Sequence, residues 1–487
     1  MKVLIVMAAL AVAGSAAAQD DGAALRQHLR QTYPSLAYVA RYRQAFPAES
    51  QGTDALWTAD TPPTITNRQD LVTALTALED QHVGLVGAKA GGSESLGVLF
   101  RTSSDGHMIV WRVFGSLVTS VRPGDVVTAI DGTATAAWLS QTAEVTFGGN
   151  RRSRAAEAAL NLGLGTHVVH ETAGLGASVT LTVQSGTATR EVTLAYRPVD
   201  DDGAAAMTAA VNSPDLPQIF TIAGLRVGAL RLGAFAPQYD DAFNTASDAA
   251  AAVAGTSDDQ AMVAGFCAVV GNFATQADAL AAKSDVLVLD LRGNMGGFGR
   301  EARLLAQALA GSPLPDSFDV FAGTTAGTVT LKPEPVDPPC RAMAVRRPVI
   351  VLTDAGTRSA GELMAAWLWG AGLTVAGERT VGAGGGFEFG SAGFDLAQTG
   401  YAVRTSGNFT LFDSTHTLKA GDINEAAMID MVAADGFAPS HERPFAIQAA
   451  GLRPDITDAS TLDDLRDGGV AEVGRIITAL KAQGRLP

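Results

Sequence analysis

Between residues 286 and 378, short apolar runs alternate with amphipathic segments in a pattern that few folds can accommodate. "VLVLDL" (286–291), "RPVIVLTD" (347–354) and "LTVAGE" (373–378) have the length and composition of buried strands. "REARLLAQALAG" (300–311) and "AGELMAAWLWGAG" (360–372) lie between them and have the apolar spacing of helices. Strand–helix alternation of this kind predicts a parallel sheet with right-handed crossover connections. We therefore expect an α/β core in this region.

Two loops at the carboxyl ends of these expected strands carry the residues most able to do chemistry. Open α/β sheets bind ligands at that edge, and "RGNMGG" (292–297) and "AGTRS" (355–359) both fall there. Ser359 would stand at the N-terminus of the next helix, where the free amides and the helix dipole favour developing negative charge. Ser359 also lies three residues before Glu362, which is the spacing of a capping box. The pattern leaves both interpretations of Ser359 open, a nucleophile and a helix cap.

Backbone amides near Ser359 are candidate donors to an oxyanion. The N–H of Ala360 follows the serine directly, and the Gly296–Gly297 pair lets a second segment of backbone approach a substrate with no Cβ in the way. We expect one N–H from each loop, near Gly296 and at Ala360, to form a two-donor oxyanion hole.

The rest of the chain divides into three regions. Residues 19–93 are expected to form a mainly helical N-terminal region. Residues 94–198 are expected to form a β-rich module, because "LGVLF", "MIVWRV", "VVTAID" and "ASVTLTV" alternate with turn residues. Residues 199–487 would form the core. Within the core, an Ala-rich stretch at about 239–284 has few turn signals, and we expect it to be a helical insertion that lies over or beside the main body.

The first 18 residues predict export. Lys2, the apolar run after it and the Ala16–Ala18 ending are typical of a secretory signal peptide cleaved before Gln19. No later apolar stretch reaches the length needed to span a bilayer. We therefore expect an exported protein without a membrane span, either periplasmic or secreted. The formal charge of −15 argues against nucleic acid and anionic membranes as partners.

Cys267 and Cys340 are the only cysteines in the sequence. In an oxidising compartment they would be able to pair and close a long loop, and two separate buried thiols are the alternative. The sequence contains no HExxH or CxxC spacing. We therefore expect neither a metal ion nor another cofactor.

Three motifs that follow one another in the core, "VLVLDLRGNMGG", "VIVLTDAGTRSAGE" and "VAGERTVGAG", resemble the catalytic core of the tail-specific, or C-terminal processing, serine peptidases. "LGVLF" followed by "VRPGDVVTAIDG" resembles the PDZ module of these proteases, in which loop amides capture a peptide carboxylate and an edge strand pairs with the peptide. The resemblance implies a crotonase/ClpP-like parallel-sheet protease core with an inserted PDZ-like β-rich module. It also implies polypeptide substrates that are recognised through their C-termini.

The family divides by the residue that activates the serine. One branch uses a Lys within "GExTxGKG", but this sequence has "GERTVGAG", with Ala383 at the Lys position, and Lys283, Lys332 and Lys419 fall elsewhere. The branch of the tricorn core protease and the chlamydial protease-like activity factor uses a His in a context like L-x-D-x-H. "LEDQHVGL" fits that context and makes His82 the expected general base. A position after a helix C-terminus would favour the imidazolium that His82 becomes.

The third member of the expected constellation is less well defined. In the tricorn-like branch a Glu lies three residues before the Gly of a "G-x-x-PD" segment, and this sequence has Gln448 there. A Gln can hold a His tautomer but cannot stabilise imidazolium by charge. Either Gln448 is the orienting residue, or a carboxylate takes its place, with Glu442 and Glu425 as candidates. Asp290 and Arg292 belong to the family pattern and are expected to brace the loop.

The resemblance therefore implies an exported serine endopeptidase that forms an acyl-enzyme, with Ser359 as nucleophile and His82 as general base. Ala383 and Gln448 leave a second interpretation open, a catalytically weakened peptide-binding protein on the same fold. An esterase or amidase is a third, although the G-x-S-x-G elbow of such enzymes is absent from the residues around Ser359.

Overall fold

The structure is a computed structural model that describes residues 20–51, 62–86, 94–114, 118, 120–165, 175–344, 346–386 and 393–486. The expected signal peptide, residues 1–18, lies outside the described residues.

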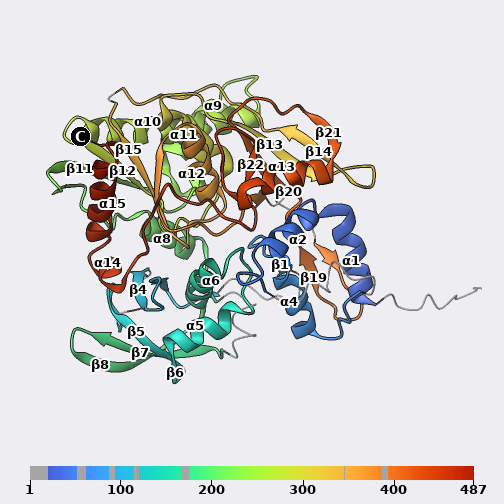
Figure 1. The fold of residues 1–487 in the computed structure, drawn as a ribbon. Coiled ribbons are helices and arrows are strands. Elements are labelled where there is room, and N and C mark those ends of the chain that lie inside the picture. The colour runs from blue at the N-terminus through green and yellow to red at the C-terminus, as the bar shows by residue number, and fades with distance from the viewer. Residues whose placement is uncertain are drawn as a thin grey trace, which may run out of the picture.

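A six-stranded sheet in the order β10-β11-β12-β15-β16-β23 forms the centre of the body (Figure 1). The first pair is antiparallel, and all the other neighbours are parallel. The apolar runs at 286–291, 347–354 and 373–378 form three of these strands, so the predicted parallel α/β core is confirmed. The strands are β10 (Ile219–Ile222), β11 (Leu225–Arg231), β12 (Val286–Asp290), β15 (Val349–Thr353), β16 (Thr374–Gly377) and β23 (Ile456–Thr457).

Helices cover both faces of this sheet, which is why its inner strands are apolar at almost every position. In β12, Leu287 and Leu289 belong to one hydrophobic cluster, with residues of α10, α11 and α12. Val286 and Val288 belong to another, with residues of α15. These residues alternate along the strand because successive side chains point to opposite faces. The covering helices are α10 (Asp258–Ala281), α11 (Gly299–Ala310), α12 (Ala360–Gly370) and α15 (Val470–Ala482).

The Ala-rich segment at about 239–284 is helical, as predicted, but it is not an insertion over the body. It forms α9 (Asp241–Ala251) and α10, which connect the neighbouring parallel strands β11 and β12. Phe266, Val270 and Phe273 of α10 are buried in the main hydrophobic cluster. Because this connection is the crossover that the parallel sheet itself requires, it is part of the core.

A second sheet, which the sequence did not predict, packs beside the first. It is antiparallel, with the order β17-β20-β13-β14-β21, and β22 pairs with β20. Helices α2 and α13 bury their apolar faces against it. Its elements are β13 (Asp316–Ala322), β14 (Thr328–Pro333), β17 (Gly385–Gly386), β20 (Asn408–Asp413), β21 (Gly421–Asn424), β22 (Phe445–Ala446), α2 (Leu36–Ala45) and α13 (Glu425–Phe437).

The β-rich segment at 94–198 forms a sheet in the order β3-β4-β5-β7-β8, with the short β6 on β5. All four strand runs expected there are strands. The segment also contains two helices that were not predicted, and α6 packs along the edge strand β3. The elements are β2 (Glu94–Ser95), β3 (Val98–Thr102), β4 (Met108–Val113), β5 (Val126–Ile130), β6 (Thr133–Ala134), α5 (Thr135–Ala143), α6 (Arg151–Leu164), β7 (Ser178–Ser185), β8 (Ala188–Ala195) and β9 (Arg197–Pro198).

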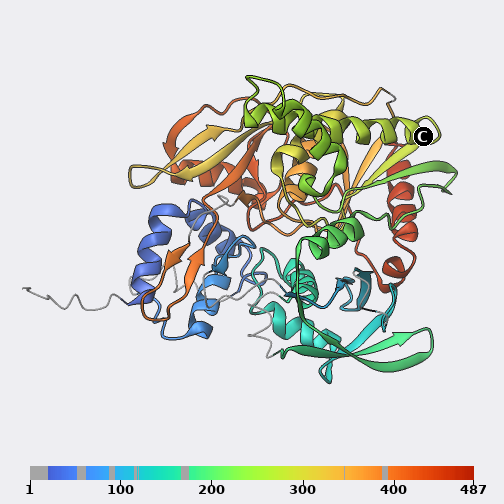
Figure 2. The same cartoon turned by 180° about the vertical axis from the view of Figure 1, so that it is seen from behind.

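The N-terminal region is helical in α1, α2 and α4, but it ends in a strand. β1 pairs with β19, which comes from the C-terminal half of the chain, and β18 completes that sheet. Figures 1 and 2 show this region beside the β-rich module, with both below the body. The elements are α1 (Asp21–Thr32), α4 (Arg68–Thr76), β1 (Gly84–Val86), β18 (Phe394–Asp395) and β19 (Ala402–Arg404). The other helices in the described residues are α8 (Asp201–Asn212), η1 (Pro237–Tyr239) and α14 (Leu462–Arg466).

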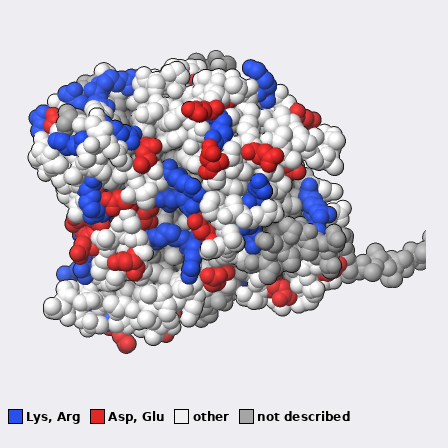
Figure 3. All heavy atoms as spheres, viewed as in Figure 1, with Lys and Arg blue, Asp and Glu red and all other residues white. Residues whose placement is uncertain are grey.

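Cys267 and Cys340 form a disulfide, which joins α10 to the segment between β14 and β15. The face in Figure 3 shows basic and acidic side chains interspersed, without a large field of one sign. Within the described ranges, none of the helices combines the length and apolarity needed to cross a bilayer.

Candidate active site

Ser359 lies in a strained turn between β15 and α12. Its backbone has φ 52° and ψ −128°, a conformation that costs a non-glycine residue on the order of 1–3 kcal/mol. The carboxylate of Glu362 accepts the Ser359 backbone N–H at 3.2 Å, as a capping box predicts. Strain of this kind is typical of a serine that is presented on a sharp strand-to-helix turn.

Glu362 does more than cap the helix. Its buried carboxylate also accepts hydrogen bonds from the Thr380 hydroxyl (2.5 Å), the Gly382 N–H (2.7 Å) and the Ala383 N–H (2.7 Å). Burial raises the pKa of this carboxyl to about 7, against the lowering effect of the four donors. Glu362 thus joins the turn that carries Ser359 to the loop after β16. In the Lys-dependent branch of the family, that loop would carry the base.

His82 is the imidazole that reaches this turn. Its Nε2 lies 3.0 Å from the Oγ of Ser359, although 277 residues separate the two in sequence. The His82 side chain is buried. Burial lowers its pKa, Asp80 raises it, Arg358 and Arg404 lower it, and the net shift is downward. The imidazole is therefore neutral near pH 7 and able to take a proton from Ser359.

Asp80 lies beside His82 on the opposite side from Ser359. Its Oδ1 accepts the backbone N–H of His82 at 2.8 Å and lies 3.7 Å from the Nδ1 of His82. Its Oδ2 accepts the hydroxyls of Tyr33 (3.0 Å) and Ser406 (2.7 Å). Helix α4 ends at Thr76, well before His82, and a helix dipole acts only near its last turn. The negative charge beside the His82 imidazole is therefore the Asp80 carboxylate, and not the dipole of a helix C-terminus as the sequence suggested.

The structure differs from the prediction at Gly296. A Cβ built on this glycine would lie 2.6 Å from the Cβ of Ser359, so the loop does approach the serine where only glycine fits. Its N–H, however, donates to the Asn294 side chain at 2.8 Å. In the described part of the chain, the N–H groups of Gly297 and Ala360 have no recorded acceptor. The N–H groups of Gly297 and Ala360, rather than that of Gly296, are therefore the candidates for the expected two-donor arrangement.

Gln448 lies close to this group but does not complete it. The residue is fully buried, and its side chain lies beside the Tyr33 hydroxyl. The contact of its amide is with Tyr33, whose hydroxyl bonds Asp80, and no contact with His82 is seen among the described residues. Glu442 is exposed, and Glu425 lies at the start of α13. Neither Glu has a recorded contact with His82 in the described ranges.

None of the three lysines considered as alternative bases contacts Ser359 among the described residues. Lys283, Lys332 and Lys419 are all exposed, and Ala383 is buried at the position of the Lys of the other branch.

Asp354 organises the two loops that flank Ser359. Its Oδ1 accepts the N–H of Gly293 (2.7 Å) from one loop and the N–H of Gly356 (3.0 Å) from the other. Arg101 of β3 donates to its Oδ2 at 2.7 Å. Burial raises the pKa of Asp354, but Arg101 and the Gly293 N–H outweigh it, so the pKa lies below its ordinary value. Asp354 was not predicted from the sequence, because its partners come from three separate segments.

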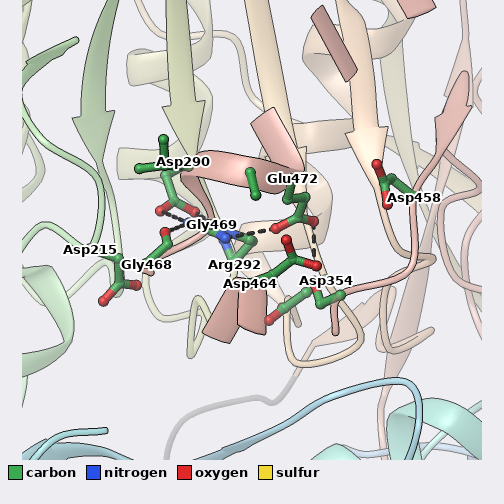
Figure 4. Close-up of polar contacts among 12 residues, drawn as sticks. Asp215, Asp290, Arg292, Asp354, Asp458, Asp464, Gly468, Gly469 and Glu472 are labelled. Carbon is green, nitrogen blue, oxygen red and sulfur yellow. Dashed lines mark hydrogen bonds and ion pairs between the residues drawn. The ribbon is translucent and has the colours of Figure 1, made fainter. Parts of the chain in front are cut away.

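Asp290 and Arg292 brace the first loop, as expected. The Arg292 guanidinium donates to both carboxylate oxygens of Asp290 at 2.9 Å and to Glu472 of α15 at 2.8 Å. It also donates to the Gly468 carbonyl at 2.8 Å. Figure 4 shows this cluster, with Arg292 between Asp290 and Glu472. All of these polar groups are satisfied, so the cluster is a brace rather than a set of reactants.

Comparisons with known proteins agree with this architecture. Residues 263–457 match the profile of Peptidase family S41. Among solved structures, mature CPAF complexed with lactacystin is similar at a TM-score of 0.58 and 16% identity, over 95% of this chain and 97% of that chain. Mature CPAF alone is similar at a TM-score of 0.57 and 16% identity, over 95% and 96%. At such identity the likeness concerns the fold.

A comparison with curated protein sequences returns no match. The S41 match spans the strand ends that carry the Asp290 brace, Ser359 and the loop with Ala383. By this match and this fold, residues 263–457 form a domain of peptidase family S41, that of the tail-specific proteases, and the protein is a serine-type peptidase.

Proposed function

We propose that this protein is an exported endopeptidase in which Ser359 is the nucleophile and His82 is the general base. The observation that carries the proposal is the 3.0 Å separation between the His82 Nε2 and the Ser359 Oγ. The strained backbone of Ser359 and the lowered pKa of His82 support it.

The proposed reaction begins when Ser359 Oγ attacks the carbonyl carbon of a peptide bond and His82 Nε2 takes the hydroxyl proton. The tetrahedral oxyanion would be held by the N–H groups of Gly297 and Ala360. His82 then gives its proton to the leaving amine, and the C–N bond breaks to leave an acyl-Ser359 ester. A water molecule, deprotonated by His82, then attacks the ester carbonyl. The bond to Ser359 Oγ breaks as His82 returns the proton to that oxygen, which releases the acid product and restores the free serine.

The β-rich module at 94–198 is proposed to act as a PDZ-like module that recognises the C-termini of substrates. Strand β3 is the edge strand of its sheet, as such binding requires. In this structure α6 covers that edge, and Arg152 donates to the Thr102 carbonyl at 2.7 Å. Recognition of a C-terminus by strand addition would therefore require α6 to move. A lower KM for peptides with a free carboxylate than for their amidated forms would support this proposal, and equal KM values would contradict it.

Hydrolysis of an unfolded polypeptide tests the proposed function. Wild-type protein should cleave casein at internal peptide bonds, and Ser359→Ala should lower the rate by about 10³-fold or more. If wild type and Ser359→Ala cleave at the same rate, Ser359 is not the nucleophile. If wild type binds the polypeptide but does not cleave it at any pH, the weakened peptide-binding interpretation is correct. Turnover of small esters without cleavage of polypeptides would instead indicate an esterase.

A further inference from the structure

We propose that Asp80, and not Gln448, supplies the negative charge that orients His82 and stabilises its imidazolium during the reaction. This inference rests on the proposed function, since it assigns a positioning residue to the same Ser359–His82 pair. Asp80 does not contact the reacting atoms, and it acts only through His82.

The geometry places the imidazole between a hydroxyl and a carboxylate. Nε2 of His82 faces Ser359 Oγ at 3.0 Å, and Nδ1 of the same ring lies 3.7 Å from Asp80 Oδ1. A proton taken from Ser359 therefore leaves a positive charge next to a negative one. Both residues are nearly inaccessible, with exposed fractions of 4% for His82 and 1% for Asp80. In a site with little water, a charge pair at this distance is stronger than at the surface.

The position of the carboxylate is fixed from three sides. One oxygen accepts the backbone N–H of His82 itself, and the other accepts the hydroxyls of Tyr33 and Ser406. Burial and the charge of Asp80 raise the pKa of Tyr33 well above its ordinary range, so its hydroxyl remains a donor. These donors come from α1 and from the loop after β19, so the N-terminal and C-terminal halves of the chain hold Asp80 together.

Gln448 lacks the features that this role needs. Its side chain carries no charge, and the contact that its amide makes is with the Tyr33 hydroxyl. The other charged groups that act on His82 are Arg358 of the serine turn and Arg404 of β19, and both oppose the imidazolium. Among these charged groups of the described residues, Asp80 is therefore the one that favours protonation of His82.

The test measures the rate at which Ser359 is labelled by a fluorophosphonate, as a function of pH, in folded full-length protein. Because the charge of Asp80 raises the pKa of His82, Asp80→Asn should move the midpoint of the acidic limb to lower pH. The plateau rate should also fall by about 10²–10⁴-fold. Asp316→Asn is the matched control, since Asp316 contacts the Nδ1 of His416 at 2.8 Å on the surface. That variant should keep the wild-type rate and midpoint.

Two neighbouring substitutions separate charge from packing. Ser406→Ala removes a donor to Asp80 but keeps the charge, so its midpoint should lie at or above the wild-type value. Gln448→Met keeps the size of the side chain and removes its amide. It should leave the midpoint in place and the rate within about tenfold of wild type. Both variants report on the proposal even if Asp80→Asn does not fold.

The outcomes distinguish this inference from the proposed function. If wild type is not labelled at Ser359, or if His82→Ala is labelled as fast as wild type, the proposed function fails. If those controls behave as expected but Asp80→Asn is slower with an unshifted midpoint, Asp80 is only structural and the inference is overturned. It is also overturned if folded Asp80→Asn matches wild type, if Ser406→Ala lowers the midpoint, or if Gln448→Met reproduces the effects of Asp80→Asn.

Discussion

Ser359 combines two roles that the sequence could not separate. As a helix cap it needs only the Glu362 carboxylate on its backbone N–H, which the structure provides. A cap alone does not explain its positive φ angle or the imidazole 3.0 Å from its hydroxyl. Cap residues ordinarily have extended backbone conformations without such strain. The strained conformation is therefore better explained by presentation of the hydroxyl to His82.

The identity of the base gives the first prediction. His82→Ala should lower the rate of acylation by about 10²–10⁴-fold, since it removes the group that takes the serine proton. Lys283→Ala should keep the wild-type rate, because Lys283 is exposed at the end of α10. The rates are measured as burst kinetics with an activated ester. A larger loss in Lys283→Ala than in His82→Ala would assign the protein to the Lys-dependent branch instead.

How far single residues could be predicted depends on what the sequence encodes locally. Ser359 and His82 could be named as candidates because each lies in a short motif. The hydrogen bond from the Gly296 N–H to the Asn294 side chain could not be predicted, because a motif does not specify side-chain directions. Asp80 stands inside the quoted "LEDQH", yet its place beside His82 depends on hydroxyls from residues 33 and 406, which sequence spacing does not bring together.

At the scale of elements, residues of the β-rich module (94–198) form hydrogen bonds with the loops around Ser359. Arg101 of β3 donates a hydrogen bond to the Asp354 carboxylate. The guanidinium of Arg358, next to the serine, donates to the carboxylate of Glu157 in α6 at 2.8 Å. Asn150, the N-cap of α6, donates to the Thr380 carbonyl at 2.8 Å. The module therefore contributes to the order of the loops in the candidate active site as well as to any binding of substrate.

Removal of one of these contacts should affect both stability and activity. Arg101→Ala leaves the Asp354 carboxylate buried without its cation, which costs about 3–5 kcal/mol in comparable sites. The free energy of unfolding should fall by that amount, and kcat should fall because Asp354 no longer fixes both loops. Arg226→Ala, which breaks an exposed pair with Asp285, should change stability by less than about 1 kcal/mol. Equal effects of the two substitutions would show that the Arg101 contact is dispensable.

The disulfide ties the crossover helix α10 to the segment before β15. Because it closes a long loop, replacement of Cys267 and Cys340 by serine should lower the free energy of unfolding by about 4 kcal/mol. Urea unfolding of wild type and the double variant measures this difference. Proteins of equal stability would contradict the expectation. Activity at low temperature should persist, since neither cysteine is near Ser359 in the described contacts.

Helices and strands could be predicted where the spacing of apolar residues within one short segment indicated them. The three parallel strands and their helices between 286 and 378 follow from apolar runs of strand and helix length. The antiparallel sheet did not, because β13 pairs with β20 almost a hundred residues later in the chain. The role of α9 and α10 was misread because an Ala-rich helix has the same composition in a crossover as in an insertion. Only its contacts with α11, β11 and β12 distinguish the two.

For the whole molecule, several buried carboxyl groups with raised pKa values should make the folded state less stable as the pH rises. Burial raises the pKa of Glu79, Asp319, Glu362 and Glu472 to about 7 and that of Glu301 to about 8. Each of these groups holds a proton in the folded state at pH values where the unfolded chain has lost it. Their contribution to stability is therefore full below the ordinary carboxyl pKa and is lost as the pH rises to about 8. Asp290 and Asp354 have lowered pKa values, so their stabilising effect is lost only in acid.

The melting temperature should therefore be highest near about pH 5 and should fall between pH 5 and 8. Glu301→Gln should flatten this fall, because it removes the carboxyl with the highest of these pKa values. Thermal unfolding followed by circular dichroism from pH 4 to 9 measures both effects. A melting temperature that rises steadily from pH 5 to 8 in wild type would contradict the expected sign.

The central claim is that the turn between β15 and α12 presents Ser359 as a nucleophile to His82. Its most direct test is to treat the protein with a fluorophosphonate and locate the adduct by mass spectrometry of the tryptic peptides. The account predicts a single adduct on Ser359 in wild type, no adduct in Ser359→Ala, and labelling slowed by about 10²–10⁴-fold in His82→Ala. An unlabelled wild type at every pH from 5 to 9, or an adduct on another serine that persists in Ser359→Ala, would contradict it.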